Sequence, residues 1–205
     1  VLSDLPSENA GYSPYAIELN GTDQNFLVDN SSEDLNVDYL TVSVWFKPDA
    51  LQSFKTLIGN RYFDNGFMSW AVQLKVDGTI RYIQKTPGVG GAFVSTDTYN
   101  ANAWNHVAVT YDGTNAKIYL NGGTPVVIAV GGGGPIQYDS GFISDNVTIG
   151  SAAGSGSVAS PGPPSQFIDG QLSNVAVWGS GLSAAQVTTI YNNGIPGDIS
   201  SLNPL

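Results

Sequence analysis

The sequence predicts an all-β protein made of antiparallel strands, and three observations carry this prediction. Seven runs between residues 15 and 120 alternate apolar and polar positions with a period of two, as half-buried strands do. Glycine, asparagine and aspartate separate these runs, as expected of tight turns. The 205-residue chain carries one well-marked helix signal, close to its end. All-β sandwiches of this length commonly form one domain, so a single domain is expected.

The predicted strands follow one another with only short connections. They are YAIEL, LTVSVWF, KTLIG, WAVQLKV, TIRYIQ, HVAVTY and AKIYL. Four separators combine asparagine or aspartate with glycine, and such pairs tolerate the positive φ that a tight hairpin needs. These pairs are Asn20-Gly21, Asp77-Gly78, Asp112-Gly113 and Asn121-Gly122. We therefore expect consecutive strands to pair mostly as antiparallel neighbours.

The stretch WNHVAVTYDGTNAKIYLNG, residues 104–122, shows this pattern most clearly. It predicts a β-hairpin that turns at residues 112–115. One face of the hairpin is aliphatic and aromatic, which suits a sheet packed on a core, with its other face wet or lining a groove. The hairpin also contains His106, the only histidine of the chain, so any Ser-His-Asp triad has to use it.

The stretch LSAAQVTTIYNNGIP predicts a short helix near the end of the chain. Ser183 is placed to cap the first turn, and Gln186 three residues later completes a capping box. An apolar stripe predicts that the helix docks by one face. Gly194 is a natural residue to end the helix, because its backbone adopts positive φ without a steric cost.

Two segments break the strand pattern. Residues 130–137, VGGGGPIQ, contain too many glycines for a strand and predict a flexible connection. Residues 150–166, GSAAGSGSVASPGPPSQ, form a long loop rich in small residues and proline. Loops of this length are usually functional or disordered, and both readings stay open.

Composition excludes several classes of function. The chain has no cysteine, which excludes disulfides, zinc–thiolate sites and a cysteine nucleophile. Its net charge of −10 argues against nucleic-acid partners and anionic lipid, whereas clustered carboxylates suit calcium. No apolar run is long enough for a membrane span, so we expect no membrane insertion. We expect a soluble chain trimmed from a longer precursor.

Four ordered blocks resemble the laminin G-like domains of the concanavalin A-like lectin and pentraxin superfamily. They are YAIELNGTDQNFLV, LTVSVWFKPD, WNHVAVTYDGTNAKIYLNG and QFIDGQLSNVAVWGSGLSAAQVTTIYNNG. The resemblance implies a two-sheet antiparallel jelly-roll sandwich over residues 12–195, with one short C-terminal helix, an N-terminal extension at 1–11 and a C-terminal linker at 196–205. Similar modules occur in secreted bacterial proteins and in marine phage virions, so it implies an extracellular or virion-surface location.

The family uses this fold for glycan binding, adhesion and, in a few branches, glycan cleavage. Its glucan-cleaving members carry two glutamates on one strand, whereas this chain has glutamate only at positions 8, 18 and 33. An aspartate pair drawn from Asp64, Asp97 and Asp139 stays open as an alternative. In the family pattern, His106 belongs to the sheet, so we interpret it as structural and expect no enzymatic activity.

Calcium is the cofactor that the sequence suggests, in a structural role and at either of two places. The pentraxin-like stretch LIGNRYFDNGFMSWAV maps a ligand pair onto Asp64 and Asn65, although the partner loop at 151–166 offers no carboxylate. The second place depends on pairing of the first strand with the last. This pairing would bring the Asn20–Asp23 turn beside Asp169, where two carboxylates and turn carbonyls suit a hard cation. The alternative is that Asp23 and Asp169 only cap their own turns.

Glycan binding usually needs an aromatic platform with polar groups beside it. Trp45 is out of phase with its apolar neighbours, so it lies either in a groove or in the packing of the sheet's second face. The favoured binding rim joins the 151–166 loop to the loop that follows KTLIG. The predicted ligand-binding residues are Arg61, Tyr62, Phe63, Asp64, Asn65 and Phe67.

These observations predict a non-catalytic recognition or adhesion module that binds surface carbohydrate or glycoprotein as part of a larger protein. The alternative is a structural or decoration module of a virion or surface assembly, without a ligand of its own. A minor alternative is a polysaccharide-degrading enzyme. Possible further partners are other copies or modules of a larger assembly.

Overall fold

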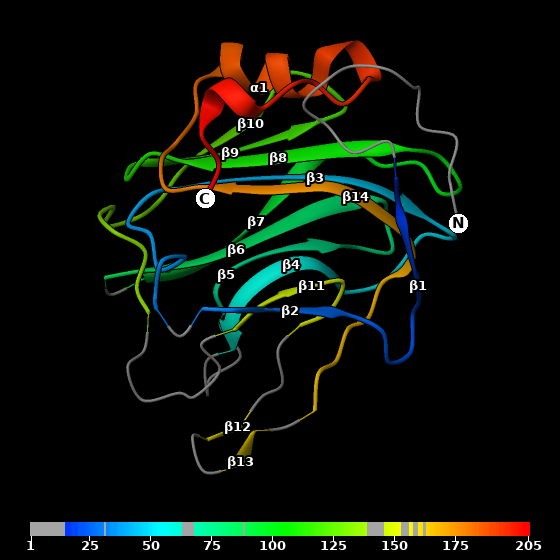
Figure 1. Cartoon of the computed structure of the whole chain (residues 1–205). Coiled ribbons are helices and arrows are strands. Elements are labelled where there is room, and N and C mark those ends of the chain that lie inside the picture. Colours follow the sequence, from blue (N-terminus) through cyan, green and yellow to red (C-terminus); the bar gives the residue numbers. More distant parts are fainter. Residues whose placement is uncertain are drawn as a thin grey trace.

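The computed structural model describes residues 15–30, 32–62, 68–87, 89–138, 146–152, 156–157, 160–161 and 163–205. Two antiparallel sheets lie face to face, with one helix outside the upper sheet (Figure 1). Each sheet has six strands. The two-sheet antiparallel sandwich and its short C-terminal helix confirm the predicted fold class.

The first sheet has the strand order β1-β14-β3-β8-β9-β10. Its strands are β1 (Ile17–Asn20), β14 (Asp169–Trp178), β3 (Leu40–Pro48), β8 (Asn105–Tyr111), β9 (Asn115–Leu120) and β10 (Val126–Ala129). Strands β8 and β9 form the predicted hairpin, with Val109 opposite Ile118. Gly113 and Gly122 have φ of 92° and 70°, which confirms the conformation expected at these turns.

The second sheet has the strand order β2-β11-β4-β5-β6-β7. Its strands are β2 (Phe26–Asp29), β11 (Asn146–Ile149), β4 (Lys55–Tyr62), β5 (Met68–Leu74), β6 (Thr79–Thr86) and β7 (Val89–Thr98). The short pair β12 (Gly156–Ser157) and β13 (Ser160–Pro161) forms a separate ribbon, drawn at the bottom of Figure 1. Strands β1 and β2 are therefore edge strands of different sheets.

The inner faces of the two sheets enclose one apolar core. The first sheet contributes Val42, Val44 and Phe46 from β3, and the second contributes Trp70 and Val72 from β5. Trp70 and Phe46 are both fully buried. Because side chains alternate along a strand, burial of these residues directs their neighbours to the outer face of each sheet.

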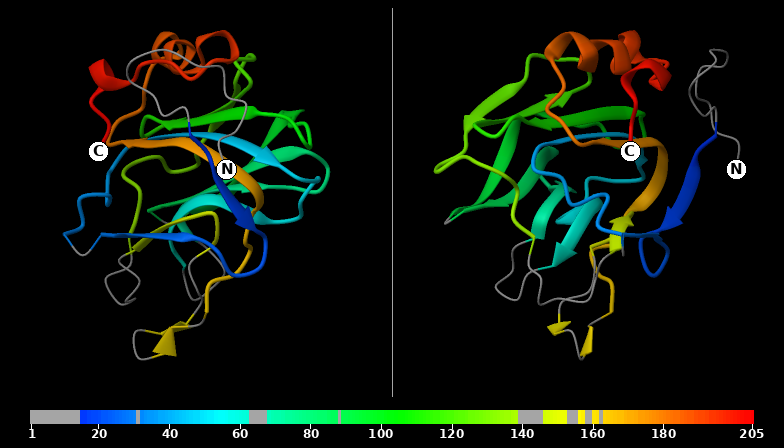
Figure 2. Two further views of the ribbon diagram at one scale, coloured as in Figure 1. Left: turned by 45° about the vertical axis from the view of Figure 1, so that its right-hand side comes forward. Right: turned by 60° about the vertical axis from the view of Figure 1, so that its left-hand side comes forward.

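The outer face of the first sheet is also buried over β8 and β14, because the helix covers it there (Figure 2). Every residue of β8 is buried, so the expectation that the hairpin's second face is wet or lines a groove is wrong. Trp45 is 3% exposed and stacks on Tyr191 of the helix, with ring centroids 5.9 Å apart. Of its two predicted locations, the structure therefore selects packing of the second face.

Helix α1 spans Ala184–Tyr191 and begins as predicted, with Ser183 and Gln186 forming a capping box. Its end differs from the prediction. Asn192 and Asn193 already adopt left-handed φ of 43° and 56°, so they end the helix before Gly194 is reached. Gly194 instead closes a short 3-10 turn. Asparagine tolerates the left-handed conformation better than most residues, so the helix ends earlier than the predicted end at Gly194.

No helix within the described part of the chain is long and apolar enough to cross a membrane.

Candidate functional site

A row of mainly polar residues crosses the outer face of the second sheet, on the side away from α1. Strand register places Thr56 of β4 opposite Gln73 of β5, Gln73 opposite Arg81 of β6, and Arg81 opposite Val94 of β7. We call these four residues the outer row. The neighbours of Arg81 on β6, Ile80 and Tyr82, point into the core and are fully buried. Alternation along β6 therefore fixes Arg81 on the outer face.

A segment that we call the strap, residues 163–168, lies along one end of the outer row. The carbonyl of Gln166 accepts a hydrogen bond from Thr56 N at 3.0 Å. Its side-chain Oε1 accepts from Thr56 Oγ1 at 2.9 Å and from Gln73 Nε2 at 2.6 Å. Gln73 in turn accepts a hydrogen bond from Arg81 Nη1 at 3.0 Å. A continuous hydrogen-bonded chain thus joins the strap to the guanidinium group.

Phe54 covers the guanidinium group from the connection between β3 and β4. The guanidinium carbon of Arg81 lies 5.4 Å from the centroid of the Phe54 ring. Phe54 has φ of 50°, an uncommon conformation for a bulky residue, and its side chain is 46% exposed. The core does not account for this conformation, because the ring lies outside it. Strained residues of this kind cluster at binding sites.

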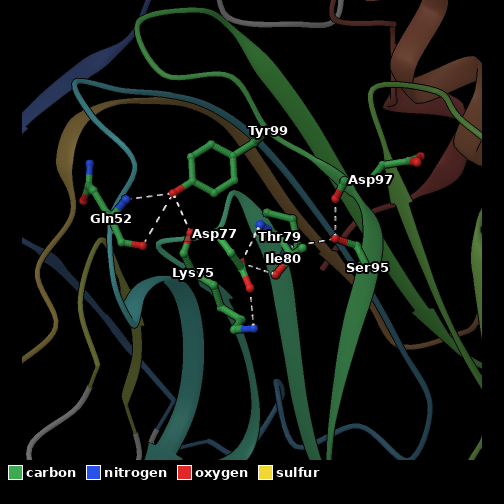
Figure 3. Close-up of polar contacts among 8 residues, drawn as sticks. All are labelled: Gln52, Lys75, Asp77, Thr79, Ile80, Ser95, Asp97 and Tyr99. Carbon is green, nitrogen blue, oxygen red and sulfur yellow. Dashed lines mark hydrogen bonds and ion pairs between the residues drawn. The ribbon is translucent and has the colours of Figure 1, made fainter.

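Gln52, two residues before Phe54 in the sequence, anchors the connection that positions Phe54. Gln52 N donates to Tyr99 Oη at 2.8 Å, and Tyr99 Oη donates to the carbonyl of Lys75 at 3.0 Å (Figure 3). The side-chain amide of Gln52 also pairs with both backbone groups of Asp169, at the start of β14. Hydrogen bonds therefore tie the connection to the residues directly after β5 and β7 and to the first residue of β14.

The turn between β5 and β6 sets the start of the strand that carries Arg81. Asp77 Oδ1 accepts from Thr79 Oγ1 at 2.6 Å and from Thr79 N at 3.0 Å, and Lys75 Nζ lies 2.9 Å from Asp77 Oδ2 (Figure 3). The hydrogen bonds from Thr79 and Lys75 hold the pKa of Asp77 well below its usual value. The turn is therefore fixed by a carboxylate that stays ionised.

Arg81 has no anionic partner in the described part of the chain. The ion pairs found there join Lys75 to Asp77 and Lys117 to Asp112. Partial burial lowers the pKa of the Arg81 guanidinium from its ordinary value, because desolvation disfavours the charged form. Arg81 is therefore a partly buried cation beside an exposed ring, in a chain with a net charge of −10.

The rim predicted from the sequence falls largely outside the described residues. Arg61 and Tyr62 form the end of β4, where Tyr62 pairs with Met68. Phe63, Asp64, Asn65 and Phe67 lie outside the described residues, as does much of the 151–166 loop. Their roles in ligand and calcium binding therefore stay predictions.

The second predicted calcium position has the expected backbone geometry. Strands β1 and β14 pair, with Asn20 opposite Asp169, which confirms the predicted neighbourhood of turn and strand. Asp23 Oδ1 accepts from Asn20 Nδ2 at 2.8 Å, so this carboxylate already serves its own turn. Among the described residues, no three acidic, histidine or cysteine side chains gather to hold a metal. Calcium at Asp23 and Asp169 stays a prediction.

His106 lies in the wall of the sandwich, as interpreted from the sequence. It is fully buried beneath α1, and its Nε2 lies 2.8 Å from Ser43 Oγ. Its Nδ1 has no hydrogen-bond partner among the described residues, so the carboxylate that orients a catalytic histidine is missing there. Burial lowers the pKa of His106 to about 3. The imidazole is therefore neutral at physiological pH and shielded from substrate.

An apolar groove of about 880 Å³ lies between the edge strands β1 and β2. Its walls include Ile17 of β1, Leu27 of β2 and Val175 of β14. Ile17 is 50% and Leu27 is 59% exposed, which is high for aliphatic side chains on a sheet. Among the described residues that line the groove none is charged, whereas the outer row contains Arg81.

Phe54, Gln73, Arg81 and Gln166 were not identified from the sequence as site residues. The run TIRYIQ does indicate one of them. Arg81 alternates with the apolar Ile80 and Tyr82, which places its side chain on the outer face of a strand. Nothing in the sequence pattern indicates that Phe54 lies over Arg81, since that contact depends on the anchoring of Gln52.

Comparisons with known proteins agree with this architecture. No relative was found among curated protein sequences. A pentraxin from Limulus polyphemus is 21% identical, with a TM-score of 0.57 over 89% of this chain and 84% of its own. The CBM40 domain of a Ruminococcus gnavus sialidase, bound to α2,3-sialyllactose, is 16% identical, with a TM-score of 0.65 over 85% of this chain and 97% of its own.

A botulinum neurotoxin type C structure, described as depending on two ganglioside molecules for cell entry, is 16% identical. Its TM-score is 0.60 over 87% of this chain and 42% of its own. At these identities the likeness shows the fold alone. A family model described as the concanavalin A-like lectin/glucanases superfamily, of the laminin G type, matches residues 20–188. The chain belongs to the concanavalin A-like lectin/glucanases superfamily.

Proposed function

We propose that this chain is a non-catalytic recognition module that binds carbohydrate, free or on a glycoprotein, through the outer face of its second sheet. The observation that carries the proposal is the contact of Phe54 with Arg81 at the end of a hydrogen-bonded polar row. An exposed ring offers a sugar its apolar face, and the guanidinium group beside it offers hydrogen bonds, held in place by the buried amide of Gln73.

Similar structures support a carbohydrate ligand as the first to test. The CBM40 domain holds sialyllactose, and the botulinum neurotoxin interacts with gangliosides, which also carry sugars. A secreted or virion-displayed parent protein, as proposed from the sequence, would bring this module to surface glycans. Calcium in a structural role, at the corner of Asp23 and Asp169, belongs to the same proposal.

Replacing Phe54 with alanine is expected to weaken carbohydrate binding about tenfold, which corresponds to about 1.4 kcal/mol. The loss follows from removal of the ring on which the sugar would stack. Affinity electrophoresis in gels containing laminarin, alginate, agar or carrageenan measures this change. Leu51→Ala is the matched control, because Leu51 is an equally exposed apolar residue of the same connection and lies outside the outer row. Equal retardation of both variants and the parent chain would contradict the assignment.

No hydrolase or lyase activity is expected. The described glutamates, Glu18 of β1 and Glu33 of a turn, lie on separate segments, and His106 is shielded. Of the aspartates considered as a catalytic pair, Asp64 and Asp139 lie outside the described residues. Reducing-end release from the same four polysaccharides should equal that of a blank. Turnover that is lost in an Asp97→Asn variant would overturn this expectation.

The apolar groove favours the alternative, a structural module that packs against another protein chain. An exposed patch containing Ile17 and Leu27 at the edges of both sheets is the kind of surface that a neighbouring subunit covers. Sedimentation equilibrium separates the two functions. Self-association that is lost in Leu27→Asp, without any glycan binding, would favour the structural module.

A further inference from the structure

Arg81 is held in place, yet most of its hydrogen-bonding capacity is unused by the described residues. Nη1 donates to Gln73, and the Phe54 ring covers the guanidinium group. Arginine has five N–H donors in a planar fork. No other described side chain or carbonyl accepts a hydrogen bond from Arg81. The rest of the fork is therefore available to a ligand.

The surroundings of Arg81 restrict what that ligand can be. Gln73 is 1% exposed and accepts the hydrogen bond from Arg81, so the guanidinium has a defined orientation. Val94, the cross-strand neighbour of Arg81 on β7, is 38% exposed and gives an apolar border. A ligand group at this place meets a cation, a ring and an aliphatic surface within one small area.

A half-buried cation without a counter-ion leaves part of its desolvation cost uncompensated. The lowered pKa of Arg81 has this cause, since burial alone accounts for it. An anion that accepts two parallel N–H bonds from the fork would offset that cost, and carboxylates match this geometry. A neutral sugar hydroxyl would satisfy one donor and leave the charge uncompensated.

We propose that the outer row selects acidic sugars, by binding a ligand carboxylate to Arg81 while the sugar ring packs against Phe54 and Val94. This inference rests on the proposed carbohydrate-binding function and specifies its ligand class. The Gln166–Gln73 chain acts as a positioning device, because it holds the acceptor that orients the guanidinium. Because the chain as a whole, with a net charge of −10, repels anions, Arg81 is the group that would have to discriminate acidic from neutral sugars.

A glycan array tests the proposal. It carries oligosaccharides that end in a uronic or sialic acid, each beside its methyl ester, its neutral parent and a sulfated counterpart. We expect binding of carboxylated glycans and at least a tenfold loss for the methyl esters, because the ester keeps the shape and removes the charge. Arg81→Gln should remove the difference between acid and ester. Arg81→Lys should keep only a small part of it, because a lysine ammonium cannot form the bidentate pair.

Lys117→Gln is the matched control, because it removes the same charge from β9 of the other sheet, where Lys117 faces Asp112. It should bind like the parent chain. Equal binding of acids and esters would overturn the carboxylate inference and leave the carbohydrate-binding function standing. Preference for the sulfated glycans would also overturn it. Failure to bind any glycan, with the chain folded by circular dichroism, would overturn both.

Discussion

Lowering the pH from 6.5 to 4.5 is expected to reduce the free energy of unfolding by about 2.3 kcal/mol through His106. The pKa of His106 is lowered to about 3 in the folded chain by burial, whereas the unfolded value is near 6.5. Below pH 6.5 the unfolded chain binds a proton that the folded chain does not. The contribution of His106 to the free energy of unfolding is therefore present above this pH. It is lost as the pH falls toward 3, by up to about 1.4 kcal/mol for each unit.

The measurement is urea denaturation at several pH values, compared with a His106→Gln variant. The variant should lack the contribution of His106 to this slope, whereas carboxylates that begin to take up protons near pH 4.5 contribute equally to both chains. Because the chain has one histidine, its imidazole NMR signal reports the folded pKa without ambiguity. An imidazole that titrates near pH 6.5 in the folded protein would contradict the buried placement beneath α1.

Replacing Gly170 with alanine is expected to destabilise the fold by about 3 kcal/mol or more. A Cβ at this position would lie 2.3 Å from the carbonyl oxygen of Lys47 and 2.8 Å from Cα of Pro48, both backbone atoms of β3. Its φ of 133° is also a conformation that side chains avoid. Neither obstacle can be relieved by rotation of a side chain, so β3 and β14 would have to move apart.

Gly131→Ala is the matched control, because a Cβ there meets no atom within 4 Å. Thermal melts of the two variants should therefore separate, with Gly131→Ala close to the parent chain. Gly170 follows Asp169, which is hydrogen-bonded to Gln52. Loss of the contact between β3 and β14 should therefore also loosen the connection that carries Phe54. Equal melting temperatures for the two variants would contradict the close approach of β3 and β14.

The sequence was sufficient for most of the fold because its local signals agree with one another. Alternation located the strands that have one face in the core, and the Asp-Gly and Asn-Gly pairs located their turns. Strands β7 and β10 lacked a distinct pattern, since β7 has two glycines after its first residue and β10 has four residues that are apolar throughout. The end of α1 was misjudged because Asn192 and Asn193 compete with Gly194 for the left-handed conformation.

The candidate site was less accessible to sequence reasoning. Aromatic and charged residues clustered in one loop, such as Tyr62 and Phe63, attract notice in a sequence. Phe54 and Arg81, by contrast, are distant along the chain and meet only because strand register and the Gln52 anchor bring them together. Trp45 illustrates the reverse case, because its phase along the strand left a groove and the packing of the second face equally open until α1 was placed over it.

The central claim is that the outer face of the second sheet binds carbohydrate, and an NMR titration tests it most directly. A ¹⁵N-labelled chain is titrated with a uronic-acid oligosaccharide, and the shifts of backbone amides and of arginine Nε are followed. We predict that the largest changes fall on Gln73, Arg81 and Val94 and on the Phe54 connection. Changes confined to the apolar groove around Leu27, or no change at millimolar oligosaccharide, would contradict the claim.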